Sequence, residues 1–179
     1  GKLASERGGA LSASELGRDH VIATGGGPGI MEAANRGATE AGALSIGFNI
    51  TLPHEQEPNA WSTPDLTFRF HYFAMRKMHL AMRAAALVVF PGGFGTLDEL
   101  FELLTLVQTG KMRPVPIVLY DRAYWQALLN LDVMAKARLI RAQDLALFAY
   151  ADTPEEAYAR IVEGAGDNWR PATEDRVQT

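Results

Sequence analysis

Cysteine is absent from the 179 residues of this sequence. Its absence excludes disulfide bonds, cysteine nucleophiles and metal sites with cysteine ligands. Long apolar runs are also missing. The longest, around Leu87–Phe90, suits a buried strand and is far shorter than the roughly 20 residues that span a membrane. Because no basic segment followed by an apolar one opens the chain, we expect a cytoplasmic protein without a membrane partner.

Basic charge is scarce as well. The chain has 17 lysines and arginines against 21 acidic residues, a formal net charge of −4 and a pI of about 5.6. General nucleic-acid binding needs a basic face, so we expect no nucleic-acid partner, although one local phosphate site is compatible with this charge. The length predicts a single domain over residues 1–179, with residues 1–18 and 166–179 peripheral.

Short apolar runs alternate with helical patterns along the chain. This alternation predicts an α/β protein, a Rossmann-like parallel sheet with helices on both faces. Ligands of such sheets bind at the carboxyl ends of the strands. The predicted strands are 20–24, 45–50, 66–70, 86–90 and 115–120, and the predicted helices begin at 30, 71, 97, 124 and 154.

A first glycine-rich loop, Gly25–Gly29, directly follows the first predicted strand. Its glycines allow close backbone approach to a ligand, and the helix that follows would present free N–H groups to an anion. A tight turn without a ligand explains the segment equally well. Pro28 and Ile30 break the dinucleotide fingerprint, and the next strand ends in Asn49 and Thr51 instead of an acid. NAD is therefore disfavoured.

A second loop, Pro91–Thr96, follows the strand at 86–90 and opens another helix. It lacks the lysine of a P-loop, so nucleoside triphosphate hydrolysis is disfavoured. Glu99 follows Thr96 by three residues, which fits a capping box. It equally fits a carboxylate beside a phosphate site, placed to stabilise positive charge on a sugar. Asp98 can complement the helix dipole, and Glu102 lies one turn from Glu99.

The remaining charged candidates precede the second loop. By residue type alone, Arg76 and Lys77 are typical of a solvated charge pair. His71 and His79 are eight residues apart and no H-E-x-x-H spacing occurs, so we predict no metal site.

Together these segments resemble the LOG family, the cytokinin riboside 5′-monophosphate phosphoribohydrolases. Residues 91–99 fit its PGGxGTxxE motif, Met75-Arg76-Lys77 fits its basic segment upstream of that loop, and residues 25–38 resemble its GGGxxGxMxxxxxGA signature. The resemblance covers roughly residues 21–119. Segments 52–59 and 70–77 look like those of a bacterial subgroup with longer chains.

The resemblance implies a Rossmann-like homodimer or larger homo-oligomer that needs no cofactor. It implies hydrolysis of AMP, or of an N6-substituted AMP, to the free base and ribose 5-phosphate. Arg76 and Glu99 would be the catalytic pair. The family has one more strand before the position of Gly1, so we expect a strand to be missing from this chain. The residues implied in substrate binding are Gly26, Gly27, Gly29, Met75, Lys77, Gly92, Gly93, Gly95, Thr96 and Glu102.

Four further functions are compatible with some of these features. Lysine decarboxylation, a label often given to such proteins, needs a Schiff-base lysine, and of the four lysines only Lys77 lies in a motif. A nucleotide sensor without catalysis would need no carboxylate, so the presence of both Arg76 and Glu99 argues against it. Hydrolysis of a different nucleoside monophosphate, or transfer of ribose phosphate to another acceptor, stays open because the sequence does not identify the base pocket.

Overall fold

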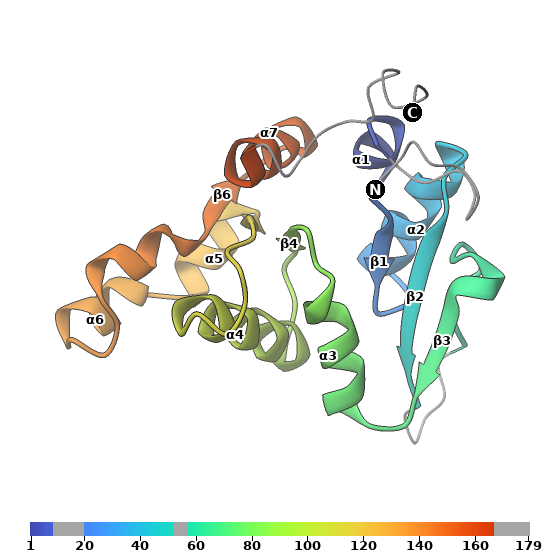
Figure 1. Ribbon diagram of the computed structural model, residues 1–179. Coiled ribbons are helices and arrows are strands. Elements are labelled where there is room, and N and C mark those ends of the chain that lie inside the picture. Colours follow the sequence, from blue (N-terminus) through green and yellow to red (C-terminus); the bar gives the residue numbers. More distant parts are fainter. Residues whose placement is uncertain (9–19, 52–56, 167–179) are drawn as a thin grey trace, which may run out of the picture. The chain divides into compact units, whose positions relative to one another are not determined.

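The computed structural model describes residues 1–8, 20–51 and 57–166. These residues belong to two compact units: an N-terminal unit up to Arg83 and a C-terminal unit from Ala84 (Figure 1). Each unit has a three-stranded parallel sheet, in the order β1-β2-β3 or β4-β5-β6. The predicted α/β class, with parallel sheets flanked by helices, is confirmed. The prediction of one domain stays a prediction, and the ends predicted to be peripheral fall mostly outside the described residues.

The N-terminal unit carries the first glycine loop between its first strand and its second helix. The observed bounds of β2 match the predicted strand, and α2 begins at the predicted residue. The elements of this unit are α1 (Lys2–Glu6), β1 (Ile22–Thr24), α2 (Ile30–Glu40), β2 (Ser45–Ile50), the 3₁₀ turn η1 (Pro64–Leu66), β3 (Thr67–Phe70) and α3 (Phe73–Met82).

The C-terminal unit carries the second glycine loop between β4 and α4. Its elements are β4 (Leu87–Val89), α4 (Phe94–Gln108), β5 (Ile117–Tyr120), α5 (Arg122–Leu128), α6 (Leu131–Lys136), the 3₁₀ segment η2 (Ala142–Leu147), β6 (Ala149–Ala151) and α7 (Pro154–Ala165).

Two predictions about the C-terminal unit are wrong, and one strand is missed. The helix predicted from residue 97 begins at Phe94, inside the glycine loop. The single helix predicted from residue 124 is two helices, because the extended backbone of Leu129 ends α5. The sequence does not predict β6: its three residues are too few for a recognisable pattern, and pairing with β5 forms it.

Burial against helices explains the C-terminal unit's sheet. Val118 of β5 packs with Ala157 and Ile161 of α7, which covers one face. Because side chains alternate along a strand, Ile117 and Leu119 point to the opposite face, and both are buried as well. A strand buried on both faces is the arrangement expected in a parallel α/β sheet.

The N-terminal unit is packed differently, because one face of β2 is polar and buried. Ser45 and Asn49 lie on this face with Gly47 between them. The segment that follows Asn59 covers it: the Ser45 hydroxyl donates to the carbonyl of Trp61 at 3.3 Å. Phe48, on the opposite face, stacks on Phe68 of β3 at 5.8 Å between ring centroids.

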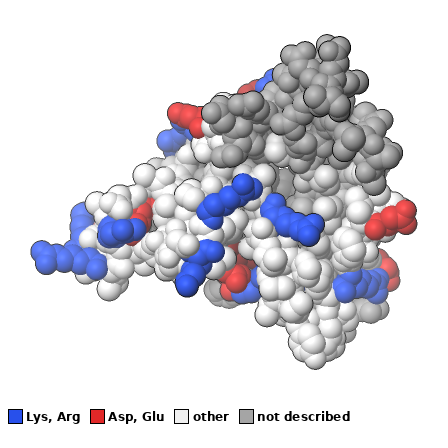
Figure 2. Space-filling view, in the orientation of Figure 1, with Lys and Arg blue, Asp and Glu red and all other residues white. Residues whose placement is uncertain are grey.

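Charged side chains of both signs are scattered among uncharged residues on the face drawn in Figure 2. Within residues 1–8, 20–51 and 57–166, no helix has the length and apolarity needed to cross a membrane. The expected cytoplasmic location, the expected oligomer and the expected absence of nucleic-acid and membrane partners stay predictions.

Candidate functional site: two glycine loops at strand ends

The first loop, Gly25–Gly29, leaves the carboxyl end of β1 and is packed tightly against its own unit. Gly26 has φ +70°, a left-handed conformation that favours glycine. A Cβ on Gly26 would lie 2.5 Å from the side-chain amide of Asn49, which is 7% exposed. Conformation and packing both demand glycine at position 26.

Asn59, in the segment that precedes η1, is hydrogen-bonded to this loop. Its backbone N–H donates to the Gly26 carbonyl at 2.9 Å. Its side-chain Nδ2 donates to the Gly27 carbonyl and to Oδ1 of Asn35, each at 3.1 Å. Asn35 is fully buried in α2 and also accepts from the hydroxyl of Thr24 at 2.7 Å. These bonds hold the loop in one conformation.

Arg76, one of the two predicted catalytic residues, lies beside this first loop. A Cβ on Gly25 would approach its Nη1 to 3.1 Å, and its guanidinium carbon lies 5.8 Å from the ring centroid of Phe73. Arg76 and Lys77 are half-buried on α3, which differs from the solvated pair that composition indicates. Met75, on the same helix, is 45% exposed.

The second loop differs, because two of its glycines, Gly93 and Gly95, face open space. α4 begins at Phe94 with Gly93 as N-cap, and no side chain caps it. The first four N–H groups of a helix lack intrahelical partners and attract anions. A Cβ on Gly93 or Gly95 would meet no atom within 4 Å. Uncapped N–H groups with open space in front of them are the features that an anion site requires.

Thr96 and Gly92 close the inner side of this second loop. A Cβ on Gly92 would collide with the Thr96 side chain, so glycine is required there for packing. Tyr124 of α5 donates its hydroxyl proton to the Gly92 carbonyl at 2.7 Å.

The capping-box interpretation of Glu99 is wrong. With Gly93 as N-cap, Thr96 is the third helical residue and Glu99 the sixth, so Thr96 is not the N-cap and Glu99 is not at the third position, as a capping box requires. Asp98 also falls outside the first turn. At about 100° per residue it lies opposite the buried Leu100 and is exposed, whereas Glu99 is half-buried.

The structure thus groups the predicted residues by unit. Gly26, Gly27, Gly29, Met75, Arg76 and Lys77 belong to the N-terminal unit, and Gly92, Gly93, Gly95, Thr96, Glu99 and Glu102 to the C-terminal unit. Glu102 is half-buried one turn after Glu99. The catalytic pairing of Arg76 with Glu99 stays a prediction.

Sequence reasoning misses two kinds of site residue. Asn35, Asn49 and Asn59 hold the first loop, and Tyr124 holds the second. Asn35 has a visible signal: it stands four residues after Met31 and three before Ala38, on the apolar face of a helix. Tyr124 has none, because 32 residues separate it from Gly92.

Among the described residues, no group of three histidine or acidic side chains is arranged to hold a metal ion.

Comparison with known proteins shows the family of this chain. A family model described as "Possible lysine decarboxylase" matches residues 31–161, a span that includes the second loop and α4 and that begins after the first loop. A protein of Oryza sativa subsp. japonica named "Probable cytokinin riboside 5'-monophosphate phosphoribohydrolase LOG4" is 27% identical over 148 residues, 81% of this chain and 63% of that protein. The Arabidopsis thaliana "Cytokinin riboside 5'-monophosphate phosphoribohydrolase LOG3" is 26% identical over 156 residues, 86% of this chain and 71% of that protein.

The fold also matches a solved structure, the molybdenum cofactor binding protein of Rippkaea orientalis. The TM-score is 0.57 at 24% identity, over 80% of this chain and 76% of the other. This similarity concerns the fold. The chain spans 63% and 65% of the lengths of two of its rice relatives.

Proposed function

We propose a function from one premise: this chain belongs to the LOG family, whose matching family model is described as possible lysine decarboxylase. The proposed reaction is hydrolysis of the N-glycosidic bond of a purine nucleoside 5′-monophosphate, AMP or an N6-substituted AMP. Its products are the free base and ribose 5-phosphate. The rice and Arabidopsis relatives that are named phosphoribohydrolases support this reaction type.

One observation carries the proposal: the uncapped N-terminus of α4, with open space at Gly93 and Gly95 and a half-buried carboxylate two turns into the same helix. A phosphate monoester is an anion of the size and charge that such a helix end binds. A nearby carboxylate would stabilise the cationic sugar that forms when a glycosidic bond breaks. Both features lie within the C-terminal unit.

In the proposed mechanism, N–H groups at the start of α4 bind the 5′-phosphate and hold the ribose in place. The bond between C1′ and N9 lengthens, its electron pair leaves with the base, and positive charge develops on the sugar. Glu99 stabilises that charge and orients a water molecule, whose oxygen bonds to C1′. One proton of the water is transferred to the departing base, and the other stays on the oxygen that becomes the C1′ hydroxyl. Arg76, beside Gly25, is the second proposed catalytic residue.

Glu99→Gln tests the mechanism. The amide keeps the size of the side chain but removes its negative charge, so we expect AMP binding to persist while turnover falls about 10²–10³-fold. Adenine release is measured by chromatography, and AMP binding by calorimetry.

The matched control is Asp98→Asn, a neutralised acid on the exposed side of the same helix. It should keep wild-type turnover. If the Glu99 variant turns over AMP at the wild-type rate, the role of Glu99 is refuted.

AMP binding by the wild type without base release would favour a nucleotide sensor instead. A panel of nucleoside monophosphates shows which base is released, and incubation with lysine plus pyridoxal phosphate tests for decarboxylation.

A further inference from the structure

The contact between Tyr124 and the second glycine loop joins two elements that are distant in sequence. The hydroxyl of Tyr124, a half-buried residue of α5, donates to the carbonyl oxygen of Gly92 at 2.7 Å. Gly92 directly precedes Gly93, the N-cap of α4. In a planar trans peptide the C=O and the next N–H point in opposite directions. Tyr124 therefore fixes the direction of the Gly93 N–H, which points away from it.

The start of α5 is built to hold Tyr124 in place. Asp121, its N-cap, has φ +73°, which is uncommon for any residue with a side chain. The Asp121 carboxylate accepts the backbone N–H of Tyr124 at 3.1 Å. The next residue, Trp125, is fully buried and donates its ring N–H to the Tyr120 carbonyl at 2.9 Å. The position of Tyr124 is thus held by the hydrogen bond from its N–H to Asp121 and by the burial of the adjacent Trp125.

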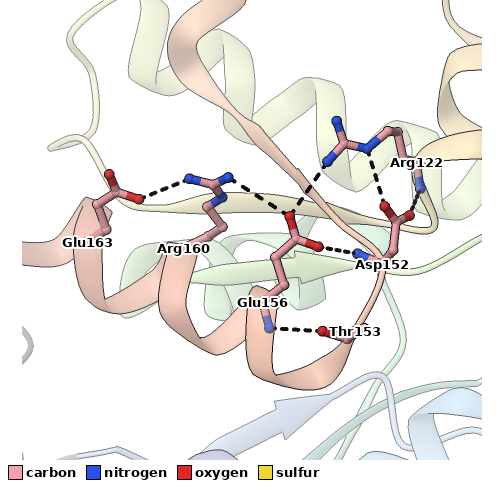
Figure 3. Close-up of polar contacts among 6 residues, drawn as sticks. All are labelled: Arg122, Asp152, Thr153, Glu156, Arg160 and Glu163. Carbon is pink, nitrogen blue, oxygen red and sulfur yellow. Dashed lines mark hydrogen bonds and ion pairs between the residues drawn. The ribbon is translucent and has the colours of Figure 1, made fainter.

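A charged network also holds the start of α5 (Figure 3). The backbone N–H of Arg122 donates to Asp152 Oδ1 at 2.9 Å, and its Nε donates to Oδ2 at 3.3 Å. Its Nη2 lies 3.6 Å from Glu156 of α7, which in turn accepts the N–H of Asp152 at 3.0 Å. Single exposed ion pairs add little stability. Here the backbone bonds give the network its fixed geometry.

We propose that Tyr124 is a positioning residue of the anion site on α4, holding the peptide between Gly92 and Gly93 so that its N–H joins the donors that grip a phosphate. This inference rests on the proposed function for the identity of the anion. Tyr124 itself does not touch the substrate. Its effect is therefore on phosphate affinity and not on the bond-breaking step.

Tyr124→Phe is the experiment, because it removes one hydroxyl and keeps the ring. Ribose 5-phosphate binding to the full-length protein is measured by calorimetry, and AMP turnover by base release. We expect the Kd for ribose 5-phosphate and the KM for AMP to rise about fivefold to tenfold, since one neutral hydrogen bond is lost. The kcat should stay within about twofold, because binding made equally in ground and transition states alters KM alone.

Tyr150→Phe is the matched control, a half-buried tyrosine of β6 in the same unit. It should leave both constants unchanged. The inference is overturned if Tyr124→Phe binds ribose 5-phosphate as the wild type does, if its kcat falls with KM unchanged, or if the wild type does not bind ribose 5-phosphate. Wild-type binding without release of base from AMP refutes the proposed function alone, and the comparison of Kd values still tests Tyr124.

Discussion

The two glycine loops occupy equivalent places, each between a parallel strand and the helix that follows, yet their glycines serve different ends. In the first loop, Gly26 has a left-handed backbone and lies against the amide of Asn49. In the second, Gly93 and Gly95 have no positive φ and front open space. Glycine at position 26 is needed for the fold of the first loop, whereas the glycines at positions 93 and 95 leave open space in the second.

This difference separates two meanings of a glycine-rich motif. Both loops read alike in the sequence, as a strand, several glycines and a helix. The atoms around each glycine distinguish the two cases: a glycine packed against its own protein, and a glycine that leaves space for another molecule. The comparison predicts that alanine substitution destabilises the protein at the first loop and weakens binding at the second.

The largest expected effect is that of Gly26→Ala on stability. The alanine would have to adopt a left-handed backbone conformation, and its methyl group would displace the buried Asn49 amide. Together these changes should lower the free energy of unfolding by about 3 kcal/mol. Urea unfolding measures the loss. Gly42→Ala is the matched control in the same unit: it has φ +68° but no atom within 4 Å of the added carbon, so only the backbone strain remains. Equal losses at the two positions would refute the packing against Asn49.

Gly95→Ala should have a smaller effect, of a different kind. The methyl group fits the fold and alanine favours a helix over glycine, so the melting temperature should not fall. The added carbon would take part of the space in front of the α4 amides. We expect the Kd for ribose 5-phosphate to rise about tenfold, or by 1.4 kcal/mol. Unchanged affinity, measured by calorimetry, would show that the anion lies elsewhere.

The smallest expected effect is on the pH dependence of stability, and it concerns the C-terminal unit, which carries the second loop. Hydrogen bonds from the Gln108 side chain and then from Arg141 lower the pKa of the buried Asp144 carboxyl below its ordinary value of 3.8. A group with a lowered folded-state pKa stabilises fully above its ordinary pKa, and this contribution disappears as the pH falls through the folded-state value.

Melting curves of the wild type and of Asp144→Asn, recorded from neutral to acid pH, measure this contribution. The wild type should melt higher at neutral pH, and the difference should narrow below the ordinary pKa of the carboxyl. A difference that is constant throughout the acid range would contradict the assignment.

The sequence predicts regular elements well where burial leaves a pattern. β2 is placed correctly because its residues form a short apolar run. The start of α2 is placed correctly because the glycine loop ends directly before it. The start of α4 is misplaced by three residues, because glycines at 93 and 95 read as a loop by propensity. The helix begins there nonetheless, since buried residues such as Leu100 hold the whole of α4 against its unit.

The candidate site is predictable only in part, for a related reason. Motif spacing identifies the glycines, and the family match confirms the recognition. Contacts over long sequence separations leave no local pattern, so the bonds from Asn59 to Gly27 and from Tyr124 to Gly92 could not be foreseen. The structure also decides against a capping role for Glu99, which depends on where α4 begins.

The uncapped backbone N–H groups at the start of α4 limit how selectively this end of the helix can bind anions. Backbone N–H groups recognise the charge and size of a phosphate but carry no information about the carbon skeleton attached to it. Inorganic phosphate and unrelated phosphate monoesters would therefore compete for this end of the helix. Under the proposed function, discrimination among nucleotides would have to come from side chains around the base, and the phosphate concentration would set how much substrate the protein needs.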